Sequence, residues 1–303
     1  MATQAVDERI RALIQEAGVG GTVGVAAHKL GTSEQIMLNP DTVFPTASSF
    51  KVVLLYTLYR LADAGTVDLG ARVALEERHR VPGSGVLQDL DAGAVLTVKD
   101  IATLMIVMSD NSATDMTYDL VGRDAVQQSL DRLDMPHTHL PLGCWGILAG
   151  LRDLDPNDPN LTYAELKRRL GEEEGSWDCA ALAETPENNV STPRDMLRLM
   201  EGINAGEGLS AGSRAAVIDI LLRQKISDRI PALLPFGVRA AHKTGSVKGV
   251  RNDVGLIFAG ETTYALALMS KGAQDEYEVT QLLARISRAI YDAFAGAPAT
   301  DPA

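Results

Sequence analysis

Segments with the pattern of β-strands lie near both ends of this chain, and the long stretch between them has the pattern of helices. Five short runs, apolar or alternating and bounded by turn residues, predict strands at residues 22–28, 35–38, 238–244, 254–259 and 264–270. Helical spacing over residues 6–16 and 276–294 predicts a helix at each end. We therefore expect an α+β fold, in which one antiparallel five-stranded sheet is flanked by the terminal helices and carries an inserted all-helical domain.

The helical middle of the chain defines the second predicted domain. Its helices are expected at residues 49–64, 97–108, 112–121, 124–133, 162–170, 194–203 and 213–222. We predict a sheet-and-terminal-helix domain of residues 1–42 plus 224–303, and a helical domain of residues 43–223 that carries the candidate nucleophile. Residues 141–189, rich in glycine and proline, are expected to form a long loop region with one helix. Residues 296–303 are expected to be disordered.

The net charge of −12 narrows the possible partners. Nucleic acids and anionic membrane surfaces both attract basic patches, so we expect neither of them as a partner. An anionic small molecule would have to be held by a local cluster of Lys and Arg. The five histidines show no spacing typical of metal ligands, and we predict no metal and no cofactor. Cys144 and Cys179 are expected to be free thiols.

The N-terminal segment bears on where the protein works. Residues 1–17 form a mixed amphipathic stretch, without the charged region and following apolar region of a secretory signal. No uninterrupted apolar run is long enough to cross a bilayer. We therefore expect a cytoplasmic protein. The alternative is a periplasmic or secreted protein whose mature chain has been given a new start codon.

Ser48 and Lys51 form the first candidate catalytic pair. Pro45 and the small residues after it mark a loop, and residues 49–64 then have the pattern of a buried helix. Ser48 falls at or just before the first turn of that helix, and Lys51 lies three residues later on the same face. Unpaired backbone N–H groups and a nearby amine can activate a serine hydroxyl as a nucleophile. The alternative is a capping serine beside a lysine that extends to solvent.

Three short motifs occur in order along the chain: Ser48-Ser49-Phe50-Lys51, Ser109-Asp110-Asn111 and Lys243-Thr244-Gly245. The first opens an apolar helix, the second falls between two predicted helices, and the third ends a predicted strand. Each motif alone is short enough to arise by chance, but all three in this order and local structure are specific. With Ser191-Thr192-Pro193 and Arg251-Asn252-Asp253, they make nearly the whole chain resemble the class A serine β-lactamase family and its penicillin-binding relatives.

The resemblance implies a serine hydrolase that works through an acyl-enzyme. Ser48 would attack a carbonyl carbon, and Lys51 would accept its proton with the help of the neighbouring amine of Lys243. Ser109 would relay a proton to the leaving nitrogen. The backbone N–H groups of Ser48 and Ser246 would stabilise the negative charge that develops on the carbonyl oxygen.

The same resemblance implies a set of substrate-binding residues, namely Asn111, Thr244, Gly245, Ser246 and Arg251. Asn111 would hold a side-chain amide of the substrate. Lys243, Thr244 and Arg251 would hold its carboxylate through charge-assisted hydrogen bonds. Asp110 is expected to order its own loop rather than to contact substrate. The partner expected is therefore a small-molecule substrate that carries a carboxylate.

Two stretches depart from the pattern of this family. Its members hold the deacylating water with a Glu and an Asn four residues later, in a loop ahead of the helix that begins with Ser/Thr-Thr-Pro. Here Glu184 and Asn188 keep that spacing but lie much closer to Pro193, and Glu187 is a second candidate acid. Residues 83–87 stand where the family usually offers an aromatic side chain at the mouth of the cleft.

Three functions remain open on these grounds. The first is hydrolysis of a β-lactam or a similarly shaped small amide through an acyl-enzyme on Ser48. The second is a cytoplasmic esterase, amidase or peptidase on the same scaffold. The third is a penicillin-binding protein that is acylated but deacylates slowly. A carboxylate poised on water near Ser48 would favour rapid turnover, and its absence would favour slow deacylation.

Overall fold

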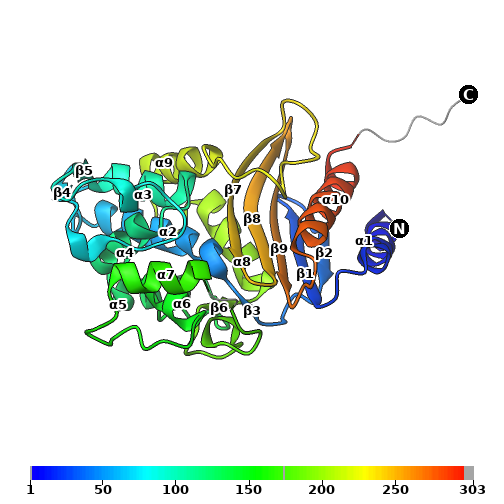
Figure 1. Cartoon of the computed structure of the whole chain (residues 1–303). Coiled ribbons are helices and arrows are strands. Elements are labelled where there is room, and N and C mark those ends of the chain that lie inside the picture. The colour runs from blue at the N-terminus through cyan, green and yellow to red at the C-terminus, as the bar shows by residue number, and fades with distance from the viewer. Residues whose placement is uncertain (1, 173–174, 297–303) are drawn as a thin grey trace, which may run out of the picture.

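A five-stranded antiparallel sheet joins the two ends of the chain in the computed structural model, which describes residues 2–172 and 175–296 (Figure 1). Its strands are β1 (Thr22–Lys29), β2 (Gln35–Leu38), β7 (Arg239–Val247), β8 (Val250–Ala259) and β9 (Thr262–Lys271). They lie in the order β2-β1-β9-β8-β7. Strand β1 pairs along its whole length with β9, so the N-terminal hairpin and the C-terminal strands form one sheet, as predicted.

Ten helices surround this sheet within the described residues. They are α1 (Ala2–Ala17), α2 (Lys51–Asp63), α3 (Val98–Val107), α4 (Asn111–Val121), α5 (Arg123–Arg132), α6 (Cys144–Gly150), α7 (Tyr163–Glu172), α8 (Pro193–Ala205), α9 (Ala211–Leu222) and α10 (Glu276–Phe294). Figure 1 shows α1 and α10 on one face of the sheet and α8 on the other, with the remaining helices beyond α8. In the described part of the chain, none of these helices is long and apolar enough to span a membrane.

Short elements connect the helices. Two small strand pairs are β3 (Phe44–Pro45) with β6 (Val190–Ser191), and β4 (Arg72–Ala74) with β5 (Val95–Thr97). Four 3₁₀ turns are η1 (Ala47–Phe50), η2 (Glu77–His79), η3 (Leu87–Asp89) and η4 (Ala180–Leu182). The β3–β6 pair matters most for the site, because it fixes the chain just before η1.

Alternation along the strands creates two apolar cores. Successive side chains of a strand point to opposite faces, so Val25 belongs to the core under α1 and α10, while Ala26 belongs to the core under the helical region. Helix α2 is central to the second core, and every residue from 51 to 59 is buried. The predicted α+β architecture is therefore confirmed. The division into two domains stays a prediction, since one continuous core joins the sheet to the helices.

Three local predictions need correction. Residues 141–189 contain α6, α7 and η4 rather than one helix, because the seven residues of α6 are too few to show helical periodicity. The helix predicted from residue 49 begins only at Lys51, as α2, and the 3₁₀ turn η1, which contains Ser48, comes directly before it. The Lys243-Thr244-Gly245 motif lies inside β7, which continues to Val247, rather than at its end. Residues 297–303, most of the tail expected to be disordered, lie outside the described residues.

His28 links strand β1 to helix α8 through a pH-dependent contact. Its Nδ1 lies 2.5 Å from Glu201 Oε1, and its Nε2 lies 2.9 Å from the carbonyl oxygen of Thr32. Both partners are acceptors, so both ring nitrogens can donate at once only when the ring is protonated. Burial lowers the pKa of His28, but these hydrogen bonds outweigh it, and the net pKa is raised.

The His28–Glu201 contact is therefore expected to stabilise the protein in acid more than in base. A raised folded-state pKa gives stability that is fully present below the unfolded pKa of about 6.5 and is lost as the pH rises through the folded pKa. His28→Gln should lower the free energy of unfolding by about 1 kcal/mol at acidic pH and by less at alkaline pH. Denaturant melts at both pH values test this, and an equal loss at both would contradict it.

Candidate active site

The turn that carries Ser48 is held rigidly from two sides. Asn252 on β8 donates its side-chain amide to the carbonyl oxygens of Pro45 and Thr46, at 2.9 and 3.0 Å. Ser49 Oγ donates to Thr46 O at 2.7 Å. Ala47 has a φ of 43°, an unusual value for a residue with a side chain. Backbone strain of this kind is retained where the surrounding structure over-determines it, and it concentrates at functional sites.

Lys51 and Lys243 meet at the hydroxyl of Ser109. Both lysines are completely buried, Lys51 at the start of α2 and Lys243 on β7. Lys51 Nζ donates to Ser109 Oγ at 3.2 Å and to Ser109 O at 2.8 Å. Lys243 Nζ donates to the same hydroxyl at 3.0 Å. Because Ser109 Oγ accepts from two amines, its own proton is left to be donated outward. The structure thus brings together the residues predicted to move protons.

The proximity of the two amines affects their protonation. The pKa of Lys243 lies well below the usual value for a lysine, because burial disfavours its charged form and the Lys51 ammonium repels a second positive charge. Lys243 also donates to the carbonyl oxygen of Thr244 at 2.7 Å, which compensates part of the cost of burial.

The Ser109-Asp110-Asn111 turn is fastened to residues 81–87. Asp110 caps α4 by accepting from Ala113 N at 2.9 Å, and its other oxygen accepts from Val86 N and Leu87 N at 2.6 and 2.9 Å. Asp110 therefore orders its own loop. Asn111 Oδ1 accepts from Lys51 Nζ at 3.0 Å. Asn111 Nδ2 donates to the carbonyl oxygen of Pro82 at 2.8 Å, so both ends of the amide have protein partners here.

Gly245 allows strand β7 to run directly against the turn of Ser48. A Cβ atom at Gly245 would lie 2.6 Å from Thr46 O and 3.0 Å from Ser48 N, which is too close for any side chain. Thr244 is buried on one side of it, and Ser246 is exposed on the other. Ser246 also lines the same cavity as Ser48. The two backbone N–H groups implied as oxyanion donors thus belong to segments in close contact.

Arg229, which the sequence analysis did not single out, contacts the same strand. It is almost fully buried, and it donates to Ser246 Oγ at 2.7 Å and to Gly245 O at 3.3 Å. Arg251 instead donates to the carbonyl oxygens of the β7–β8 turn and pairs with Glu276 at the start of α10. Arg229 rather than Arg251 therefore brings positive charge to Ser246. The local sequence does not predict this role for Arg229, because the contact depends on how the segment before β7 lies against that strand.

The residues that surround Ser48 enclose a cavity of about 240 Å³. Its lining consists of Ala47, Ser48, Phe50, Gly83, Ser84, Asn111, Cys144, Ile147, Leu148, Leu151, Ser246 and Val247. Its lining includes Ser48, which is the predicted nucleophile, Asn111 of the second motif, and Ser246 and Val247, which follow the third motif on β7. This cavity is the candidate active site.

Cys144, at the start of α6, lines the cavity at Ser48 and lies near Lys51. Burial raises the pKa of its thiol to about 11, while the nearby Lys51 ammonium acts in the opposite direction. Cys144 is a free cysteine, as predicted, but its place in the site was not foreseen. Among the described residues, no carboxylate is bonded to Lys51 or Ser109.

The two candidate acids of the sequence analysis lie elsewhere. Glu184 pairs with Lys271 at the end of β9, at 2.6 Å. Glu187 is exposed and lines a different cavity, below the loop of residues 180–188. Asn188 donates to the carbonyl oxygens of Ala181 and Ala183, at 2.9 and 2.8 Å. These contacts hold the loop together, and neither glutamate lines the cavity at Ser48.

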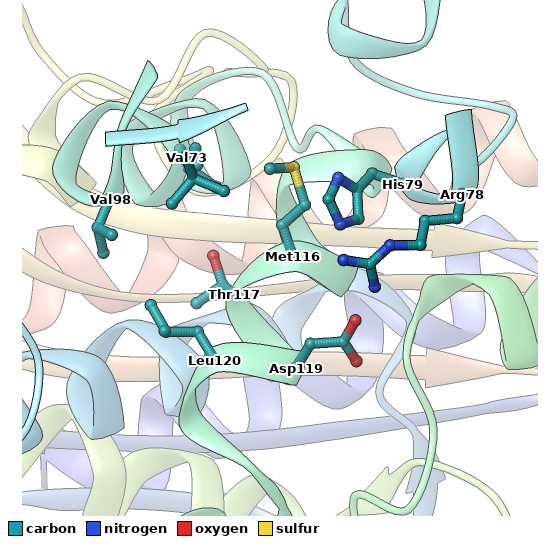
Figure 2. Close-up of a pocket in the computed structure, with 9 residues that line it drawn as sticks. Val73, Arg78, His79, Val98, Met116, Thr117, Asp119 and Leu120 are labelled. Carbon is teal, nitrogen blue, oxygen red and sulfur yellow. The ribbon is translucent and has the colours of Figure 1, made fainter. Parts of the chain in front are cut away.

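A second cavity, of about 220 Å³, lies along α4 away from Ser48 (Figure 2). Met116, Leu120 and Val73 give it an apolar wall, and Figure 2 shows Arg78 and Asp119 facing each other at one side. Arg78 is paired with Glu76. This cavity shares no lining residue with the one at Ser48.

One class of serine hydrolase uses lysine amines, instead of a histidine, to activate its serine. The serine, the two buried lysines and the sheet flanked by helices in this chain fit that class. The chain belongs to the β-lactamase enzyme family, whose family model matches residues 5–294. It is similar to β-lactamase L2 of Stenotrophomonas maltophilia, with 26% identity over 281 residues, which cover 90% of this chain and 81% of that protein.

Solved structures agree with this assignment. A β-lactamase from Sphaerobacter thermophilus is 31% identical, with a TM-score of 0.77 over 95% of this chain and 98% of that one. PBP-A, solved in mutant form as an acyl-enzyme complex with penicillin G, is 25% identical, with a TM-score of 0.77 over 96% of each chain. The resemblance seen in the three motifs and the predicted fold class are both confirmed.

Proposed function

We propose that this protein is a serine hydrolase that is acylated at Ser48 by β-lactams or similarly shaped small amides, and that it releases the acyl group slowly. The observation that carries the proposal is the hydrogen-bonded chain from Lys51 through Ser109 to Lys243, in the site that holds Ser48. The family and the two similar β-lactamases support the substrate class.

The acylation step follows from these contacts. The Oγ of Ser48 forms a bond to the carbonyl carbon of the amide, and its proton passes to Lys51 when that amine is in its neutral form. The backbone N–H groups of Ser48 and Ser246 hold the oxyanion of the tetrahedral intermediate. When the C–N bond breaks, Ser109 donates its proton to the leaving nitrogen and is reprotonated by one of the two amines. The products are an ester on Ser48 and a free amine in the ring-opened substrate.

Hydrolysis of that ester needs a second base, which must activate water. Cys144 stands beside Lys51 at this point of the site, and a neutral thiol is a poor base for water. Glu184 and Glu187 have other surroundings. The composition of the site therefore favours slow deacylation over rapid turnover.

Mixing the protein with nitrocefin in a stopped-flow instrument tests the proposal. We expect a burst of one equivalent of opened lactam per protein, followed by a much slower steady rate. Steady hydrolysis without a burst would indicate a rapid β-lactamase instead. No reaction with nitrocefin, together with turnover of p-nitrophenyl esters, would contradict the proposal in favour of an esterase.

The lowered pKa of Lys243 predicts how acylation depends on pH. A substrate carboxylate is attracted only while Lys243 is charged, and an ordinary lysine would remain charged to about pH 10. Acylation by benzylpenicillin should therefore weaken at a lower pH than it would with an ordinary lysine, as the pH rises through the lowered pKa. The neutral ester p-nitrophenyl phenylacetate lacks a carboxylate and serves as the control. The ratio of the two acylation efficiencies should fall with pH, and a constant ratio would contradict the role of Lys243.

A further inference from the structure

The apolar cavity along α4 that Figure 2 shows adjoins a second, more polar cavity. Val98, Ile101 and Leu120 contribute to the wall of the apolar cavity, which has a volume of about 220 Å³. The polar cavity has a volume of about 330 Å³, and pockets that hold small organic ligands start at about 300 Å³. The residues that line both cavities are Arg78, His79, Met116 and Asp119. The two cavities can therefore hold one ligand that has an apolar end and a polar end.

His79 offers a hydrogen-bond donor without a partner where the two cavities meet. The residue is only 9% exposed, and its Nδ1 accepts from the backbone N–H of Glu76 at 3.1 Å. Burial and the neighbouring Arg78 lower the pKa of His79, so the ring is neutral at neutral pH and carries its proton on Nε2. Among the residues that the structure describes, none accepts a hydrogen bond from Nε2. The donor is available to a ligand oxygen.

Asp119 and Arg123 place one unpaired charge of each sign at these cavities. Asp119 is exposed on the last turn of α4 and lines both cavities, while Arg123 is exposed at the start of α5 and lines only the polar one. Arg123 donates to the carbonyl oxygen of Pro141 at 2.5 Å, which leaves its charge without a counter-ion. Within the described ranges, neither residue forms an ion pair. A ligand with a positive and a negative group could pair with both.

The other charged groups of the polar cavity are already engaged. Arg78 donates to both carboxylate oxygens of Glu76, at 2.9 and 3.3 Å. Asp115 accepts from the backbone N–H groups of Cys144 and Trp145 with its two oxygens, at 2.5 and 2.8 Å, and so caps the start of α6. A ligand that carried a charge of only one sign would therefore leave the opposite unpaired charge without a partner.

The order of the lining groups indicates how such a ligand is built. The apolar walls come first, Asp119 and His79 lie where the cavities meet, and Arg123 belongs to the polar cavity alone. We propose that the two cavities bind a free α-amino acid with an apolar side chain, such as leucine. Its side chain fills the apolar cavity, its ammonium group pairs with Asp119, and its carboxylate accepts from His79 Nε2 and pairs with Arg123. Since Ser48 lines neither cavity, this proposal is independent of the proposed function.

Isothermal titration calorimetry with four small molecules tests the ligand class. Alanine lacks most of the side chain of leucine, 4-methylpentanoate lacks the ammonium group, and leucinamide lacks the carboxylate. Leucine should bind with a dissociation constant of about 1 mM or less. It should bind about ten times more tightly than each of the other three, or more. No binding of leucine, or equal binding of leucine and any of the other three, would overturn the proposal.

Two variants locate the ligand's charged groups. Asp119 and Arg123 are exposed, so Asp119→Asn and Arg123→Gln should fold. Asp119→Asn should remove the preference for leucine over 4-methylpentanoate, and Arg123→Gln should remove the preference for leucine over leucinamide. Asp124→Asn is the matched control, because Asp124 is exposed on α5 and lines neither cavity, and it should keep both preferences. Unchanged preferences in the folded Asp119→Asn and Arg123→Gln proteins would overturn the assignment.

Ser48→Ala separates this proposal from the proposed function. The variant has no hydroxyl to acylate, but it should bind leucine as tightly as the wild type does. Loss of leucine binding in Ser48→Ala would place the ligand at the cavity of Ser48 and overturn the proposal. If leucine binds and no lactam acylates the wild type, the proposed function fails and the amino-acid site stands. If lactams acylate Ser48 and leucine does not bind, the amino-acid site fails and the proposed function stands.

Discussion

Lys51→Ala is expected to slow the acylation of Ser48 by benzylpenicillin by about 10²–10⁴-fold, the range for losing a positioned base. Lys51 donates to Ser109 and Asn111 at the start of α2, and it is the amine three residues after the nucleophile. Without it, the proton of Ser48 has no nearby acceptor, and Lys243 can act only through Ser109. The measurement is the rate of adduct formation by intact-mass spectrometry at several concentrations of benzylpenicillin.

The control for this prediction is Lys99→Ala. Lys99 is an exposed lysine on α3, so its removal changes the net charge equally but leaves the site untouched. Circular dichroism and the melting temperature establish that each variant is folded. If a folded Lys51→Ala protein were acylated within a few-fold of the wild-type rate, the base would have to lie elsewhere.

Cys144→Glu is expected to speed deacylation by about 10²–10⁴-fold. The new carboxylate would lie beside the Lys51 ammonium, and that positive charge would keep it ionised in spite of burial. It could then accept a proton from a water that attacks the ester on Ser48. The decay of the benzylpenicillin adduct, after removal of free antibiotic, gives the rate directly. The steady rate of nitrocefin hydrolysis should rise in the same proportion.

Cys144→Gln is the matched control for that gain. It has nearly the shape of glutamate but can neither carry the charge nor accept the proton, so its adduct should persist as in the wild type. A similar increase in the deacylation rate of both variants would show that the size of the side chain at position 144, and not its charge, limits deacylation. An adduct of the folded Cys144→Glu protein that decays no faster than in the wild type would contradict the proposal that a missing carboxylate limits turnover.

The sequence was sufficient for the parts of the structure that depend on local pattern. Alternating runs near both ends of the chain predicted the sheet, because an alternating strand must bury one face. The three motifs predicted that Lys51, Ser109 and Lys243 meet, although Lys51 and Lys243 lie 192 positions apart in the sequence. These motifs are short, but each one includes both the functional side chain and the neighbouring residues that set its local backbone conformation.

The parts that could not be predicted depend on contacts between distant segments. Arg229 reaches Ser246 from the loop between α9 and β7, and no pattern near Arg229 indicates this contact. Arg251 matched its motif, but Glu276 and the β7–β8 turn bind its guanidinium group. Cys144 faces Lys51 only because Asp115 caps α6 and so sets the position of that short helix. The short spacing between Glu184 and Pro193 indicated that Glu184 does not stand where the family has its glutamate. The spacing could not show that Cys144 lies beside Lys51 instead.

Intact-mass spectrometry of the wild type and Ser48→Ala after exposure to benzylpenicillin tests the central claim most directly. Ser48 lies in the lining of the cavity and no core packing depends on its hydroxyl, so the variant should keep its fold. The wild type should gain one penicilloyl group, which peptide mapping should locate on Ser48, and Ser48→Ala should gain none. An adduct that forms equally fast on Ser48→Ala, or a wild type that no acylating lactam or ester labels at Ser48, would contradict the account.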